Sequence, residues 1–147
     1  MRDDLSGLFG RLLSLYKEKL RCIDTLKSNE INLRYLLQSG NESGIPDALL
    51  ADDEIFIRLD SVEFDIRSIT ELICRTTGIV IAKFEEYFLG RNEDPLPEIK
   101  RFKTEIDIQL SVLIKERDML IHDMEKKLAD LKLDIRAFKI IRNYKSD

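Results

Sequence analysis

The sequence predicts an all-α protein, an up-down-up bundle of three long amphipathic helices with coiled-coil-like packing, whose last helix overhangs the other two. Three observations predict this fold class. Only 6 of the 147 residues are glycine and 3 are proline, so turns are few and the elements are long. Apolar residues recur at alternating steps of three and four, which is the spacing of one helix face. Three such segments follow one another with short connections, as in an antiparallel bundle.

The first helix is expected to run from about residue 4 to residue 39. Asp4 or Ser6 can cap its start, and Gly40 can close its end in the left-handed conformation. Lys19 and Asn29 interrupt its apolar stripe, as polar residues that fix the register of paired helices do. The stripe comprises Leu8, Leu12, Leu15, Cys22, Leu26, Leu33 and Leu36.

The second helix is expected to begin near Asp52 or Asp53, because acidic side chains suit a helix N-terminus. The preceding stretch NESGIP, residues 41–46, has the composition of a loop, and Pro46 can also open a short helical turn. Gly78 predicts a kink, a break or the helix end, since glycine costs about 1 kcal/mol against alanine in a helix. The stripe comprises Leu59, Val62, Ile66, Ile69, Ile73, Thr76 and Val80, with Phe84 and Phe88 beyond it.

The third helix follows the clearest boundary, LGRNEDPLPE at residues 89–98. Gly90 ends one element there, and Asp94 followed by Pro95 begins the next. The helix should then run about 50 residues, or about 75 Å, against about 50 Å for a helix of 35 residues. Its C-terminal end should therefore project beyond the bundle. The stripe comprises Ile99, Phe102, Ile106, Leu110, Leu113, Arg117, Leu120, Met124, Leu128, Leu131, Ile135, Phe138 and Ile141.

Two stretches also show the period of a strand. Residues 62–69 and 105–114 alternate apolar and polar side chains and are rich in β-branched residues. Helix is favoured for both, because no turn residues bound them and the helical stripe continues through them. In that case a set of off-stripe residues widens the apolar face, so that it contacts two neighbouring helices rather than one. The set comprises Ile57, Phe64, Ile108 and Val112.

The overhang divides the chain into a bundle body, residues 1–127, and a basic amphipathic extension, residues 128–147. From Lys126 onward there are seven basic and three acidic residues, so this end carries +4 and the rest −8 of the net −4. Such asymmetry suggests an acidic partner, or the chain's own body, as the counterpart. Exposed apolar surface with helical spacing indicates a site for a partner helix. The candidate partner-binding residues are Leu128, Leu131, Lys132, Leu133, Ile135, Arg136, Phe138, Lys139, Ile140, Ile141, Arg142 and Tyr144.

The sequence gives little support for a catalytic, metal or cofactor site. Cys22 and Cys74 lie on apolar stripes, which favours buried free thiols over a disulfide. His122 is expected on the surface, and two distant cysteines with one histidine do not form a zinc set. The acidic run ADDE, residues 51–54, is explained by capping of a helix N-terminus. We therefore expect no enzyme activity, no metal and no cofactor.

The same reasoning bounds the partners and the location. The basic residues of the extension alternate with aspartates and accompany no recognition motif, so nucleic acid is not the expected partner. No stretch approaches the roughly 20 apolar residues of a membrane span. Asp3 and Asp4 near the start are unlike a signal peptide, and a cytoplasmic location is expected. The extension can also be core, fold back on the body, or pair with a second copy.

Several stretches resemble the FlgN-type flagellar export chaperones. They are LRYLLQSGN (33–41), where a long first helix ends at a small-residue turn, ALLADDEIFIRLDSV (48–62) in the second helix, TTGI (76–79) at a break, and LSVLIKERDMLIHDMEKKLADL (110–131) in a long last helix. The resemblance implies a cytoplasmic chaperone that binds the C-terminal regions of hook–filament junction proteins and delivers them to the type III export gate. It also implies that the amphipathic C-terminal part holds the client. The alternative hypothesis is a self-associating structural coiled-coil or helical-bundle protein, which a stable dimer in solution would favour.

Overall fold

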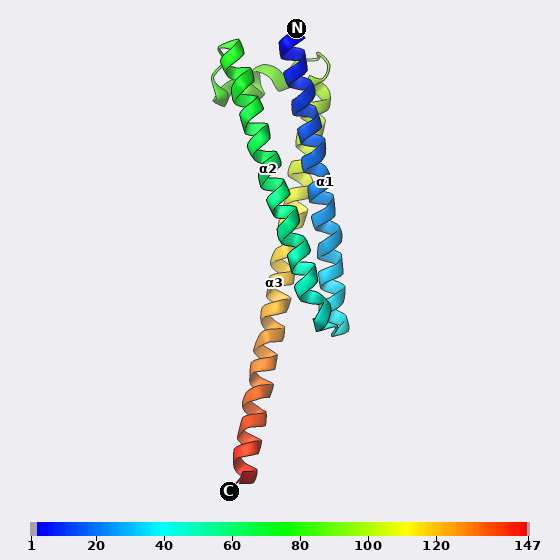
Figure 1. Cartoon of the computed structure of the whole chain (residues 1–147), viewed down its shortest axis with the longest axis vertical. Coiled ribbons are helices and arrows are strands. Elements are labelled where there is room, and N and C mark those ends of the chain that lie inside the picture. The colour runs from blue at the N-terminus through cyan, green and yellow to red at the C-terminus, as the bar shows by residue number, and fades with distance from the viewer. Residues whose placement is uncertain (1–2, 147) are drawn as a thin grey trace.

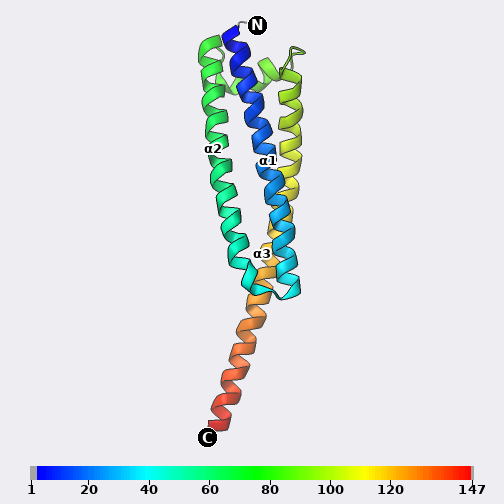
Figure 2. The same ribbon diagram turned by 45° about the vertical axis from the view of Figure 1, so that its right-hand side comes forward.

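Three long helices make up most of the chain in this computed structural model. The structure describes residues 3–146, with side chains for residues 4–140 apart from 131, 134, 135 and 138. The long helices are α1 (Asp3–Ser39), α2 (Ile45–Thr77) and α3 (Leu96–Ser146). They run down, up and down beside one another, as Figures 1 and 2 show. The predicted all-α, up-down-up bundle is confirmed, and residues 3–146 contain no strand.

The two stretches with strand-like alternation lie inside helices. Residues 62–69 belong to α2 and residues 105–114 to α3, so the helical interpretation was right. The expected widening of the apolar face was wrong, however. Each of the four off-stripe residues is exposed, because α2 and α3 bury only the stripes that they turn toward α1. These residues are Ile57, Phe64, Ile108 and Val112.

The start of α1 differs from expectation and its end agrees with it. The helix begins at Asp3, so Asp4 and Ser6 lie inside it and neither is the cap. It ends at Ser39 because Gly40 adopts a left-handed φ of 74°. The N–H of Asn41 then donates to the carbonyl oxygen of Leu36 at 3.1 Å, which satisfies one of the last free carbonyls of the helix.

The predicted start of α2 was wrong by two turns. A short 3₁₀ turn, η1 (Glu42–Gly44), leads directly into α2 at Ile45, and Pro46 occupies its first turn. Proline is tolerated there because the first N–H groups of a helix have no intrahelical acceptor. Asp52 consequently lies inside the helix, where it is buried, and the capping explanation of the run at 51–54 was wrong.

The end of α2 falls at the predicted glycine. Gly78 has a φ of 73°, and the N–H of Ile79 donates to the carbonyl of Cys74 at 3.1 Å. Thr76 and Val80 are exposed here and do not continue the apolar stripe, which corrects their assignment to it. The connection to α3 contains a 3₁₀ turn, η2 (Ile81–Lys83), and a π-helical turn, η3 (Glu85–Leu89), and it buries the two predicted phenylalanines, Phe84 and Phe88.

Replacing Gly78 with alanine is expected to lower the free energy of unfolding by about 1–2 kcal/mol, because a side chain at positive φ is strained. An added Cβ would meet no atom within 4 Å, so backbone strain alone produces the loss. Gly7 is the matched control: it lies inside α1 with equally free space. Its replacement by alanine should raise the free energy of unfolding by about 0.5–1 kcal/mol. Urea titrations of both variants measure the two effects, and equal signs would contradict the assignment.

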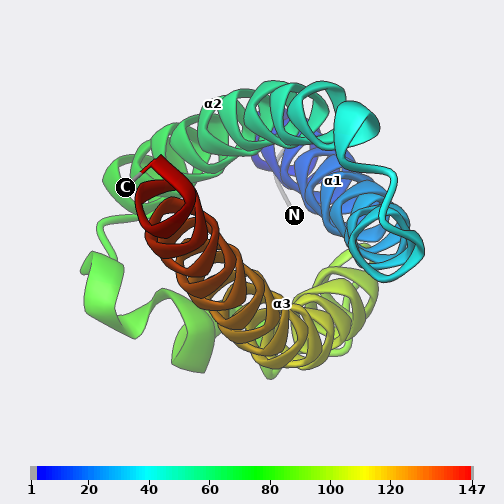
Figure 3. The ribbon, with the colours of Figure 1, turned by 90° about the horizontal axis from the view of Figure 1, so that it is seen from below.

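The core is organised around α1, which lies between the other two helices (Figure 3). Within residues 3–146, Cα atoms of α1 approach within 8 Å of both α2 and α3, whereas no Cα of α2 comes that close to α3. The larger core cluster surrounds Phe9, Ile73 and Ile99, and a smaller one at the lower end joins Leu33 to Leu120. The middle position of α1 explains why its stripe is the most continuously buried.

The C-terminal end of α3 projects beyond the other helices, as the helix lengths predicted (Figures 1 and 2). The Lys127 ammonium still reaches the body, where it donates to the backbone oxygen of Leu37. Beyond it the helix continues to Ser146. We call residues 128–146 the C-terminal arm. The arm is about 28 Å long at the helical rise of 1.5 Å per residue.

Candidate docking surface

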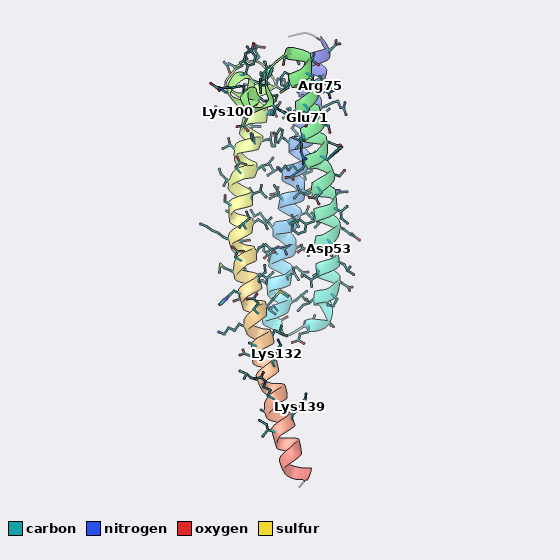
Figure 4. The ribbon with its side chains drawn as sticks, turned by 90° about the vertical axis from the view of Figure 1, so that its left-hand side faces the viewer. Asp53, Glu71, Arg75, Lys100, Lys132 and Lys139 are labelled. Carbon is teal, nitrogen blue, oxygen red and sulfur yellow. The ribbon has the colours of Figure 1, made fainter. Side chains whose placement is uncertain are left out.

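The C-terminal arm exposes apolar side chains on two faces. Leu128, at 52% exposure, lies on one face, while Leu133 and Ile140, at 60% and 68%, lie one heptad apart on another. Three exposed basic residues flank them, of which Figure 4 labels two on the arm. They are Lys132, Arg136 and Lys139. The structure therefore places six of the predicted site residues together on one free helix.

The other half of the predicted site lies on side chains outside the described residues. These side chains are Leu131, Ile135, Phe138, Ile141, Arg142 and Tyr144. Their backbone continues the helix of the arm as far as Ser146. Their part in binding stays a prediction from the sequence.

An apolar groove of about 790 Å³ opens where the arm leaves the body. Ile121, Met124 and Leu128 form its wall on α3, and Ile45 and Pro46 form the opposite wall at the start of α2. Leu37 of α1 also lines the groove, and the charged side chains along its edge are Glu42, Glu125, Lys127 and Asp130. Sequence reasoning missed this site, because residues 41–46 were expected to be a loop rather than the beginning of a helix.

Above the groove, α2 and α3 each expose a further apolar side chain. Phe56 on α2 is 40% exposed, and Ile114 on α3 is 58% exposed. Further up, a second hollow of about 320 Å³ lies between Ile66 on α2 and Lys103 on α3. The seven-residue repeat of Ile114, Ile121 and Leu128 is the sequence signal that could have found this face.

A buried cluster of polar side chains joins all three helices behind this groove. Arg117 on α3 pairs with Asp52 on α2, and its Nε lies 2.7 Å from Oε2 of Glu30 on α1. The amide of Asn29 donates to the backbone oxygen of Ala48 at 2.9 Å and also to the Asp52 carboxylate. Because each long helix contributes a charge, a slip of any helix would leave a buried charge without its partner.

Burial sets the electrostatics of this cluster. The side chain of Glu30 is fully buried, and loss of solvent raises the pKa of its carboxyl group. The Arg117 guanidinium opposes this by lowering the pKa, while the neighbouring Asp52 raises it. Arg117 also lies over the ring of Phe56, 5.3 Å from its centroid. Arg117 thus pairs directly with both carboxylates of the cluster, and Arg34 lowers the pKa of Glu30 further.

The polar interruptions of the first stripe now have partners. Lys19 pairs with Glu63 of α2 at 3.0 Å, and Asn29 belongs to the buried cluster. Both contacts tie α1 to α2, in agreement with the role in register that the sequence predicted for them. Arg117 is the one polar residue in the stripe of α3, and its contacts likewise join that helix to α1 and α2.

The two cysteines and the single histidine lie where the sequence predicted. Cys22 and Cys74 are free, buried thiols as expected, and burial raises the pKa of each. His122 is exposed on α3. Across the residues that the structure describes, no three histidine, cysteine, aspartate or glutamate side chains gather closely enough to hold a metal ion.

Helices within the described part of the chain are not both long and apolar enough to span a membrane. Comparison with models of known families, with curated proteins and with solved structures gave no match to this chain.

Proposed function

We propose that this protein is a cytoplasmic export chaperone of the flagellar type III pathway, which binds the helical terminal region of a hook–filament junction protein and keeps it soluble for export. The single observation that supports this most is the C-terminal arm: a helix clear of the body that exposes Leu133 and Ile140 beside basic side chains. The resemblance of residues 110–131 to the last helix of such chaperones supports the choice of client.

The arm provides what an amphipathic client helix needs. A client helix can pack its apolar face on the row of Leu133 and Ile140, because helical side chains seven residues apart lie on one face. Full burial of a leucine or isoleucine contributes about 1.5–3 kcal/mol, so these two residues would supply about 3–6 kcal/mol toward the cost of association. Lys132, Arg136 and Lys139 would orient an acidic flank of the client and speed the encounter.

Truncation after Lys127 tests the proposal directly. Full-length protein and residues 1–127 are used side by side as bait for the native cytoplasm, and bound proteins are identified by mass spectrometry. The truncated chain should keep its fold, because it retains both core clusters. Junction proteins captured only by the full-length chain are the expected result. Equal capture by both chains would contradict a client site on the arm, and unfolding of the truncated chain would show that the arm belongs to the core.

A single substitution, Leu133→Asp, is expected to weaken client binding at least ten-fold, since it places a charge within the apolar contact. The matched control is Ile108→Asp, which changes an isoleucine of similar exposure on the body of the bundle. Both variants should unfold within about 0.5 kcal/mol of the unmodified protein, because neither site is buried. Isothermal titration with the terminal region of the captured client measures the affinities. Equal weakening by the two variants would place the client elsewhere.

A further inference from the structure

One face of α3 remains uncovered along the groove. Ile121 and Leu128 line the groove, Ile114 precedes Ile121 by one heptad on the same face of α3, and all three are about half exposed. Within the described residues, α2 does not close over them, because none of its Cα atoms comes within 8 Å of one in α3. Phe56 adds an apolar side chain from the α2 wall. A further helix lying in this groove would complete a four-helix arrangement over this part of the bundle.

The seven-residue spacing of this face continues in the sequence from the groove into the C-terminal arm. In the sequence, Ile135 follows Ile114, Ile121 and Leu128 at the same seven-residue spacing. Leu110, Arg117, Met124, Leu131 and Phe138 form a second row between them at the spacing of a heptad. Two rows of this kind are the pattern of a coiled-coil seam. Within the described side chains, Leu110, Arg117 and Met124 of the second row face the chain's own body, whereas Ile114, Ile121 and Leu128 of the first row are exposed.

The C-terminal arm is long enough to span the groove. The arm, residues 128–146, covers about 28 Å, more than the stretch of α3 from Ile121 to Asp130 that lines the groove. Because α3 is one continuous helix, its arm cannot fold back into its own groove without breaking. The arm of a second copy can lie in the groove without any break in its helix. With Leu128 opposite Leu128 across a twofold axis, each arm lies antiparallel along the groove of the other copy.

The charges of the arm and of α2 also favour the arm of a second copy as the helix that occupies the groove. The described part of the arm carries exposed Lys132, Arg136 and Lys139, while α2 has eight acidic and three basic residues. Asp53 is the neighbour of Asp52 on α2. The contact between Asp52 and Arg117 places both aspartates level with Arg117 along the bundle axis. In the register with Leu128 on the axis, Lys139 of the second copy comes level with Arg117 and therefore with Asp53. Figure 4 labels Asp53 on α2 and Lys139 on the arm, the two groups that would approach each other.

We propose that the groove between α2 and α3 is the docking site for the C-terminal arm of a second copy of this chain, in an antiparallel dimer with reciprocal exchange of arms. This proposal does not rest on the proposed function. The face used is that of Leu128 and Ile121, with Lys139 directed to Asp53 of the other copy, whereas Leu133 and Ile140 lie on another face of the arm and remain free for a client helix. In the dimer, Lys132 and Arg136 are the basic side chains left to meet the acidic flank of the client. The dimer would also hold the arm in a fixed position.

Mass in solution, measured by sedimentation equilibrium, is the first test. Full-length protein should have a mass near twice 17.2 kDa at tens of micromolar. Ile121→Asp should raise the dissociation constant of the dimer at least ten-fold, because it places a charge in the seam. Ile108→Asp, a residue of similar exposure away from the groove, should leave the mass unchanged. A monomeric full-length protein, or a dimer indifferent to Ile121→Asp, would overturn the proposal.

Cysteine cross-linking tests the register. Leu128→Cys should form a disulfide with itself between copies, because it lies on the proposed twofold axis. Ile135→Cys alone should not, yet it should cross-link to Ile121→Cys when the two variants are mixed. The unmodified protein is the control, since Cys22 and Cys74 are buried. If Ile135→Cys forms a disulfide with itself and Leu128→Cys does not, the arms pair only with each other. That result would overturn docking in the groove.

The dimer and the client site can be separated experimentally. Leu133→Asp should abolish client capture and leave the dimer intact, whereas Ile121→Asp should dissociate the dimer and leave the arm able to capture a client. If Leu133→Asp dissociates the dimer as strongly as Ile121→Asp, the faces have been assigned wrongly and the proposed docking is overturned.

Discussion

Replacement of Arg117 by methionine is expected to lower the free energy of unfolding by about 3–5 kcal/mol, because it leaves two carboxylates buried without their cation. Glu30 and Asp52 have almost no exposed surface, and both pair with this one guanidinium. Methionine keeps much of the side-chain volume, so the loss of charge dominates the effect. Urea unfolding followed by circular dichroism at pH 7 measures the change.

Arg21→Met provides the control for this prediction. Arg21 is 71% exposed and pairs with Glu18 at 3.2 Å on the surface of α1, where ion pairs contribute about 0–1 kcal/mol. Adding Glu30→Gln and Asp52→Asn to Arg117→Met should recover part of the lost stability, since the uncompensated charges are then absent. If the single Arg117 variant is no less stable than the Arg21 variant, the buried cluster does not hold the helices together.

The Arg117 variant should also respond to pH. Burial already raises the pKa of Glu30, and removal of the Arg117 guanidinium removes the larger of the two arginine contacts that lower it, the other being Arg34. A carboxyl group with a raised pKa binds its proton more tightly in the folded state, so stability falls as pH rises from its unfolded pKa through its folded pKa. The deficit of Arg117→Met should therefore be largest at neutral pH and shrink toward about pH 4.5, near the ordinary pKa of a glutamate. A deficit that grows as the pH falls would contradict this assignment.

Phe9→Ala is expected to cost about 3–5 kcal/mol, the usual cost of truncating a buried phenylalanine to alanine. Phe9 on α1 is fully buried, and its ring lies 5.1 Å from that of Phe88 and 6.5 Å from that of Phe84. These rings fasten the connection between α2 and α3 to the first helix. The truncation leaves a cavity at the end of the bundle where that connection packs. Thermal and urea unfolding measure the loss.

Phe64→Ala is the matched control, because Phe64 also lies within a helix and is 64% exposed. Its truncation should change the free energy of unfolding by less than about 0.5 kcal/mol. The sequence had assigned this residue to a widened apolar face. A loss for Phe64→Ala that equals the loss for Phe9→Ala would support that assignment and contradict the exposed position.

Much of the fold follows from local sequence. The stripes of Leu12, Leu26 and Ile106 repeat at helical spacing, and these residues are buried as that spacing implies. Gly40 and Gly78 end their helices because both adopt a positive φ that other residues resist. The start of α2 escaped prediction for a comparable local reason. Pro46 can occupy either a first helical turn or a loop. Asp52 can either cap a helix N-terminus or form a buried ion pair.

The candidate docking surface could be predicted only in part. The relative lengths of the helices indicated that the end of α3 projects, so Leu133 and Lys139 were identified from sequence alone. The groove between Ile121 and Ile45 was not identified. A hydrophobic stripe has the same spacing whether a neighbouring helix covers it or leaves it open, and the distances between helices decide which of the two occurs.

The sequence by itself thus determined the helical class, the number and order of the long helices, two of the glycine stops and the projecting arm, since these depend on residues close together in the chain. Only the tertiary structure decided that α1 lies between α2 and α3, that Arg117 meets Glu30 and Asp52, and that a groove remains beside Ile121. The physical reason is that periodicity records which face of a helix is apolar but not the direction of the neighbour that buries it. Packing of side chains from segments far apart in the chain fixes that direction.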